Sequence, residues 1–81
     1  PSAGAESRET QALVQAAIRS LDEDHRAIIV LCDIEGRSYD EAAETLEVPK
    51  GTVRSRLHRA RMELKAKLER VLRGPDPATG A

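Results

Sequence analysis

Five basic side chains lie in one short stretch of this 81-residue chain, between residues 50 and 61, where no Asp or Glu interrupts them. Lys and Arg carry positive charge and donate hydrogen bonds, so this stretch attracts a polyanion locally, whatever the isoelectric point of the whole chain. The alternative is a solvated basic helix face without a ligand, and only the positions of the residues can decide between the two. The five residues are Lys50, Arg54, Arg56, Arg59 and Arg61.

The net charge of −1 conceals two parts of opposite sign. Residues 1–49 contain 4 Lys or Arg and 11 Asp or Glu, a balance of −7, whereas residues 50–81 contain 9 and 3, a balance of +6. Three of the acids, Asp22, Glu23 and Asp24, are consecutive, and their simplest interpretation is a helix start that complements the helix dipole. The basic part of the chain is therefore the expected contact for an anionic partner.

Periodic apolar residues predict four helices that must position these side chains. Hydrophobic residues make up 40% of the chain and Tyr39 is the only aromatic one, a composition that favours packed helices over a sheet. The sequence therefore predicts an all-α fold, a small four-helix domain at 8–73 between a flexible linker at 1–7 and a disordered tail at 74–81. The expected helices cover residues 8–20, a segment that Asp22 caps and that ends near Gly36, a segment that begins at Ser38, and residues 51–72.

The last two helices are expected to form a helix-turn-helix. Ser38 followed by Glu41 is a capping box, which marks the start of the third helix. The break at residues 47–50 is short, Val48 fits as an apolar plug between the helices, and Pro49 suits a helix N-terminus. A helix-turn-helix places its second helix, here the basic one, in the major groove of DNA.

The helix expected at 51–72 divides into an apolar and an exposed side when each residue advances about 100°. Its exposed side carries side chains that can hydrogen-bond base edges, and Arg in particular reads guanine through a bidentate contact. Polar residues beside that face could hold phosphates, although Arg56 could instead pair with an acid of the third helix, Asp40 or Glu44. The predicted base-reading residues are Arg54, Ser55, His58 and Arg59. The predicted phosphate contacts are Lys50, Thr52, Arg56 and Arg61.

The sequence predicts no enzyme, no cofactor and no metal site. It has no Ser/His/Asp set in a suggestive order, no Gly-rich phosphate loop and no metal-ligand cluster. Cys32 is the single cysteine and is interpreted as a core residue, while His25 is interpreted as structural or exposed. The single cysteine fits a reducing, cytoplasmic setting. No apolar run reaches eighteen residues and no leader sequence is evident, so we expect no membrane insertion and no signal peptide.

Residues 33–61 read DIEGRSYDEAAETLEVPKGTVRSRLHRAR. This run closely resembles region 4, the C-terminal domain of sigma factors, and most of all that of the extracytoplasmic-function (ECF) group. The segment at 21–31 resembles the preceding helix of that domain. The likeness covers about residues 10–72, and GTVRSRLHRAR at 51–61 is its most specific part.

The resemblance implies promoter recognition for an alternative sigma factor, by binding of the upstream (minus-thirty-five) element of double-stranded DNA in the major groove. It also implies docking on the β-subunit flap of the RNA polymerase core and regulation by an anti-sigma factor. The family's base-reading positions fall on the same four residues of the exposed side. Its phosphate contacts fall on Ser38, Tyr39, Lys50, Thr52 and Arg61.

Glu47 departs from the family pattern, because members often have Gly at this position in the turn. If the backbone of residue 47 adopts a left-handed conformation, Glu destabilises the fold by roughly 1 kcal/mol relative to Gly.

Two other interpretations of the function stay open: a module that mainly binds an anti-sigma factor, and the output domain of a response regulator, which shares the fold. The run SRLHRAR at 55–61 argues against the second. Without the family's region 2, which melts promoter DNA, this chain is not expected to start transcription alone.

Overall fold

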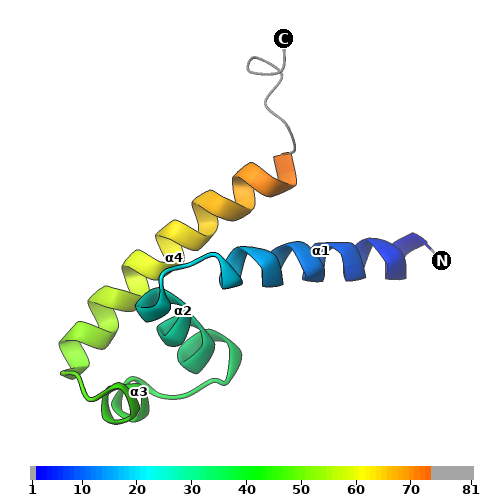
Figure 1. The fold of residues 1–81 in the computed structure, drawn as a ribbon. Helices are drawn as coiled ribbons and strands as arrows, with labels where there is room; N and C mark the ends of the chain where they lie inside the picture. Colours follow the sequence, from blue (N-terminus) through cyan, green and yellow to red (C-terminus); the bar gives the residue numbers. More distant parts are fainter. Residues whose placement is uncertain (1, 74–81) are drawn as a thin grey trace.

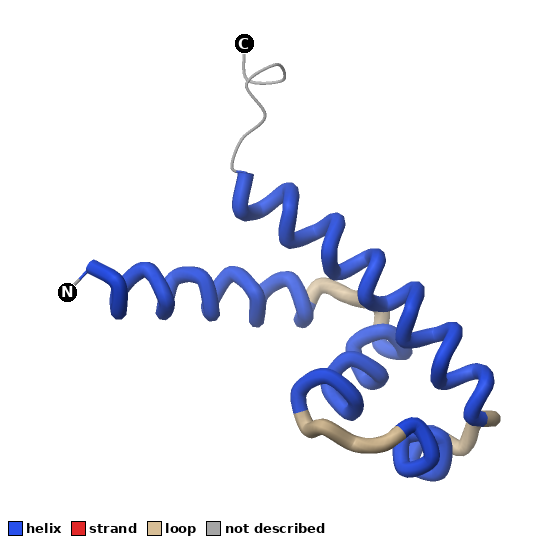
Figure 2. The backbone as a smooth tube through the Cα atoms, turned by 180° about the vertical axis from the view of Figure 1, so that it is seen from behind, coloured by secondary structure: helices blue, strands red, loops and turns tan. Residues whose placement is uncertain are grey.

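A computed structural model describes the backbone of residues 2–73 and the side chains of residues 8–73. Within that part of the chain it contains four α-helices and one π-helical segment, and no strand (Figure 2). The predicted all-α class is therefore confirmed, whereas the tail predicted at 74–81 lies outside the described residues. In chain order the elements are α1 (Ser2–Arg19), α2 (Glu23–Ile29), η1 (Val30–Ile34), α3 (Tyr39–Leu46) and α4 (Lys50–Arg73).

The first helix is longer than the sequence suggested. For residues 2–7 the predicted linker is wrong, because α1 begins at Ser2, and Pro1 lies outside the described residues. Serines and a glycine suggested a linker there, but the alanines and the glutamate of the same stretch are good helix formers, and no proline interrupts residues 2–7. At its other end α1 buries Ala17 and Ile18.

The second predicted helix is continuous but changes type half-way. It begins as α2 and widens into the π-helical turn η1, where the N–H of Glu35 donates to the carbonyl of Val30, five residues back, at 2.8 Å. Gly36 then takes φ +72°, a left-handed conformation that costs glycine little and ends the helix where the sequence predicted.

The helix-turn-helix has the predicted start and turn. The Ser38 hydroxyl accepts from the N–H of Glu41 at 3.1 Å, and the N–H of Ser38 donates to the Glu41 carboxylate at 2.9 Å, so the capping box is confirmed. Glu47 ends α3 in the left-handed conformation, with φ 57° and ψ 47°. Val48 packs against the core as expected, and α4 begins at Lys50, one residue earlier than predicted.

The core lies where α2 and α3 cover one side of the N-terminal half of α4 (Figure 1). Apolar periodicity explains the arrangement, because residues spaced three or four apart on each helix point to the same side. Beyond this region α4 continues past α1, and no helix within residues 2–73 is long and apolar enough to cross a membrane. The buried cluster consists of Leu21, Ile28, Ile29, Ala42, Val53, Leu57 and Ala60.

Candidate nucleic-acid interface

The first half of α4 has one buried and one exposed side. Val53, Leu57 and Ala60 are at most 1% exposed and anchor the helix on α2 and α3. Because side chains in between must point away from that anchor, the opposite side stays accessible. All four predicted base-reading residues are exposed there, namely Arg54, Ser55, His58 and Arg59.

Arg54 is held near the start of α3. Its guanidinium carbon lies 5.7 Å from the centroid of the Tyr39 ring, within the range of a cation–π contact. The Tyr39 side chain is half-buried and packs against the core, so it offers a fixed surface to the flexible arginine. This contact reduces the rotamers open to Arg54.

The predicted phosphate-contacting residues lie around this exposed side and differ in exposure and in the contacts they already make. Lys50 is exposed, and its Nζ is 3.3 Å from Oδ1 of Asp40. Thr52, Arg56 and Tyr39 are half-buried, whereas Ser38 is exposed and its hydroxyl already caps α3. Arg56 was considered as an ion-pair partner of Asp40 or Glu44, but within residues 8–73 it forms neither pair, and Asp40 pairs with Lys50.

Arg61 is committed to an intramolecular contact. Its Nε and Nη2 donate to the two oxygens of Asp33 at 3.0 and 2.5 Å, and this bond raises the pKa of Arg61 above its usual range. Asp33 belongs to η1, so the pair ties the π-helical turn to α4. Next to it, burial and the charge of Asp33 raise the pKa of the Cys32 thiol, which suits the predicted core role.

A polar cleft of about 460 Å³ separates the start of α2 from the exposed side of α4. One wall carries Asp22, Glu23 and Asp24, and the other carries the side chains of α4. The acidic wall therefore faces basic residues that are candidates for binding DNA. The cleft is completed by His25, Thr52, Ser55, Arg56 and Arg59.

Comparison with known proteins agrees with this geometry. Residues 11–64 match the family described as sigma-70, region 4. The chain belongs to the sigma-70 region 4 family. The resemblance found in the sequence is thus confirmed, and so is the helix-turn-helix architecture that it implied.

The relatives of this region 4 domain include ECF sigma factors. It is 58% identical over 52 residues to the ECF RNA polymerase sigma factor SigE of Mycolicibacterium smegmatis, a match that covers 64% of this chain and 20% of that protein. It is 42% identical over 67 residues to the ECF RNA polymerase sigma-E factor of Escherichia coli K12, which covers 83% of this chain and 35% of the relative. The chain therefore spans between a fifth and about a third of the length of these proteins.

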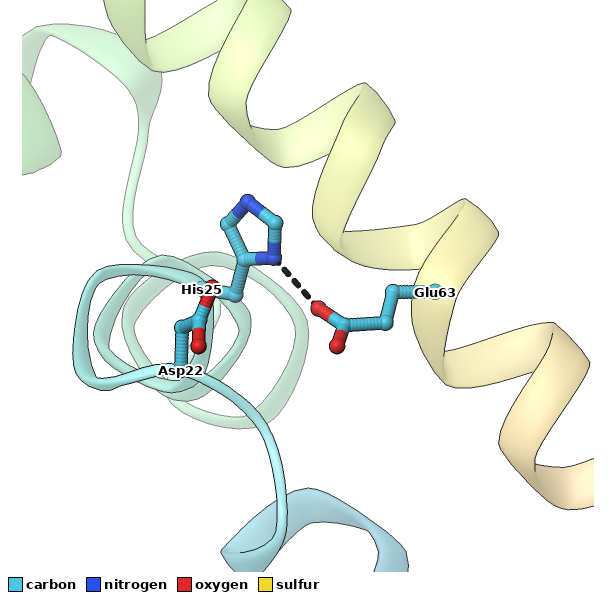
Figure 3. A group of neighbouring side chains, drawn as sticks. All are labelled: Asp22, His25 and Glu63. Carbon is cyan, nitrogen blue, oxygen red and sulfur yellow. Dashed lines mark hydrogen bonds and ion pairs between the residues drawn. The ribbon is translucent and has the colours of Figure 1, made fainter.

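One polar cluster of the region 4 domain was not predicted from the sequence. Nδ1 of His25 lies 2.6 Å from Oε1 of Glu63, and the carboxylate of Asp22 lies beside them (Figure 3). Spacing along the chain did not predict this cluster, because His25 and Glu63 are 38 residues apart and meet only in the folded domain. Helical phase gave one usable signal, since His25 and Glu63 are on the sides of α2 and α4 that meet.

Proposed function

We propose that this domain recognises the minus-thirty-five element of promoters for an alternative sigma factor, with α4 in the major groove. The observation that carries the proposal is the exposed side of α4, where hydrogen-bonding side chains lie opposite a fully buried anchor. A rigid anchor matters because base readout requires side chains held at a fixed register along the groove. Family membership supports the same reading.

The base contacts are assigned to four residues of α4. Arg54 and Arg59 are the readers of guanine, because a guanidinium can bond O6 and N7 together. Ser55 and His58 stand between them in the sequence and are exposed, so they are assigned smaller contributions to base choice. The Tyr39 ring supports Arg54 before DNA is bound, which lowers the entropy lost on binding.

The phosphate contacts are assigned to residues that flank this side: Ser38, Tyr39, Lys50, Thr52, Arg56 and Arg61. The Lys50–Asp40 pair is solvent-exposed, with side chains 51% and 78% accessible, so it stabilises the free domain little. Lys50 can therefore exchange a carboxylate for a phosphate at small cost. Arg61 must first leave Asp33, or contact phosphate while still bonded to it.

The partners proposed for the intact protein are the β-subunit flap of the RNA polymerase core and an anti-sigma factor, in the cytoplasm. The names of the relatives, which are RNA polymerase sigma factors, support the first partner. No enzymatic activity is proposed. One module makes few contacts, so the isolated domain should bind DNA weakly, and attachment to polymerase would raise its effective concentration.

Selection from random duplex DNA tests the proposal. The chain is mixed with a random pool at low salt, and the bound fraction is sequenced. We expect enrichment of one short motif, lost in Arg54→Ala and Arg59→Ala but retained in Arg70→Ala, which removes the same charge from the far end of α4. Binding without enrichment would leave α4 as a non-specific basic helix and would contradict promoter readout.

A protein-binding role is the second candidate, favoured by an apolar cleft. This cleft of about 300 Å³ lies between α1 and the C-terminal half of α4 and is lined by Leu13, Ala17 and Val71 among others. Leu13 and Val71 are 36% and 41% exposed, which is high for apolar side chains. If the random pool gives no binding at all, a protein partner becomes the better explanation for the domain.

A further inference from the structure

We propose that Asp22, His25 and Glu63 form a binding site for a divalent transition-metal cation, for which Zn²⁺ is the best match. Each residue offers one ligand atom, and these atoms all lie within 4.8 Å of one another. Figure 3 shows His25 of α2 and Glu63 of α4 pointing toward one another, with Asp22 beside His25 at the start of α2. The site shares no residue with the proposed DNA contacts, although Asp22 and His25 line the same cleft as Ser55 and Arg59.

The donor set selects the kind of cation. Imidazole nitrogen and carboxylate oxygen are both ligands that Zn²⁺ accepts, whereas Ca²⁺ and Mg²⁺ prefer oxygen ligands alone. Three protein ligands satisfy three positions of a tetrahedral ion, and the fourth remains for water. The cluster therefore fits zinc in both the type and the number of its ligands.

The His25–Glu63 distance requires only a small adjustment, whereas Asp22, whose oxygen lies within 4.8 Å of the other two ligand atoms, must move inward by up to about 1.5 Å. Nδ1 of His25 and Oε1 of Glu63 are 2.6 Å apart, as in a hydrogen bond. Two ligands of a tetrahedral zinc lie about 3.3 Å apart, so the pair must separate by about 0.7 Å. The Glu63 side chain is 35% exposed and has three rotatable bonds, so it can move this far without disturbing the core. The metal then replaces the hydrogen bond between the two side chains.

Asp22 supplies an independent reason to assign a ligand here. It occupies the N-cap of α2, where an Asp side chain commonly accepts from a backbone N–H of the first turn. Within the described chain its carboxylate makes no such bond. It lies instead beside His25 and within 4.8 Å of the Glu63 oxygen, where two negative charges repel each other. A divalent cation between them would remove that repulsion.

The site is accessible and joins two elements. Asp22 and His25 line the polar cleft between α2 and α4, which gives a hydrated cation a path to the ligands. Because Glu63 belongs to α4, a bound ion would fasten the start of α2 to the long helix. An ion that binds only the folded arrangement must stabilise the domain, so metal binding is measurable as stability.

The test is a zinc titration of the tag-free 81-residue chain, followed by calorimetry and by thermal unfolding. We expect one Zn²⁺ per chain and a rise in Tm of about 5–10 °C when free zinc is tenfold above Kd. His25→Ala and Glu63→Gln should each weaken zinc binding more than about tenfold. Glu63→Gln keeps a hydrogen-bond acceptor for His25, so the fold should be preserved, and a loss of zinc binding in this variant cannot be attributed to misfolding.

Matched controls carry the same residue types at exposed positions of α4. His58→Ala and Glu69→Gln remove an exposed histidine and an exposed glutamate of α4 that lie outside the cluster, and both should retain zinc binding. Imidazole nitrogen resonances should shift for His25 and stay unchanged for His58. Absence of saturable binding would overturn the proposal. Equal losses in His58→Ala and His25→Ala would do the same, since they would indicate adventitious surface chelation.

Discussion

Arg61 donates two hydrogen bonds to the carboxylate of Asp33 and so joins the π-helical turn η1 to the middle of α4. The contact is bidentate, which gives Arg–carboxylate pairs their directionality. Its side chains are 53% and 33% exposed, so solvent screens it and a phosphate can compete for the guanidinium. If Arg61 contacts a DNA phosphate as proposed, Asp33 sets how available its guanidinium is for that contact.

Asp33→Asn should therefore increase DNA affinity and lower stability slightly. The free energy of unfolding should fall by at most about 1 kcal/mol, because the pair is exposed. Affinity for specific and random duplexes should rise by the same factor. The plot of log affinity against log salt concentration should become steeper by about one unit, as expected for one added phosphate contact. Fluorescence anisotropy at several salt concentrations measures both quantities.

The control for this prediction is Glu35→Gln, which removes one negative charge from the adjacent segment while Arg61 stays bonded to Asp33. An equal gain of affinity in that variant would show that net charge alone is responsible. In the double variant with Arg61→Ala the gain from Asp33→Asn should disappear. If it persists, Arg61 does not contact phosphate.

Glu47→Gly should stabilise the domain. Glu47 is the one residue other than glycine with positive φ in the described chain, and a side chain in that conformation is strained. Relief of the strain should raise the free energy of unfolding by up to about 1 kcal/mol, measured by urea denaturation. In contrast, Glu44→Gly inside α3 should lower it by about 1 kcal/mol. A loss of stability in Glu47→Gly would mean that the glycine's entropy in the unfolded chain outweighs the strain.

Local pattern was sufficient to predict the helix-turn-helix and the exposed side of α4. Ser38 and Glu41 are three residues apart, and Val53 and Leu57 are four apart, so their relation is fixed within one helical turn. Such short-range signals survive whatever the tertiary packing is. The prediction that Glu47 would be strained if left-handed also depended on the turn alone.

The polar contacts between helices could not be predicted from the sequence. Arg61 and Asp33 are 28 residues apart, and periodicity says which side of each helix is apolar but not which polar residues meet at its edges. The π-helical widening at Val30–Ile34 changes the position of Asp33 relative to an ordinary α-helix, and no residue type in that segment predicts a π-helix. The early start of α1 was missed because serine and glycine outweighed the neighbouring alanines in the prediction.

The capping box predicts a pH dependence of stability. Hydrogen bonds from the backbone N–H and then the hydroxyl of Ser38 lower the pKa of Glu41 below its usual 4.5. A carboxyl with a lower pKa in the folded state contributes stability above its unfolded pKa. That contribution is lost as the pH falls through the folded pKa, below 4.5. Thermal unfolding between pH 6 and pH 3 should show this loss, and Glu41→Gln should lose less over the same range. Parallel curves for the two proteins would show that other carboxyl groups cause the decline.

Arg59→Ala and Lys50→Ala should affect DNA binding in different ways. Arg59 lies on the exposed side opposite the anchor, so its loss should cost about 1–3 kcal/mol on the selected motif and little on random DNA. Lys50 lies at the first position of α4, next to the turn, and its loss should weaken binding to every sequence and lower the salt slope by about 1. Competition assays with specific and random duplexes separate the two effects. Equal losses on both duplexes for Arg59→Ala would reassign Arg59 to phosphate, and a change in sequence preference for Lys50→Ala would reassign Lys50 to a base.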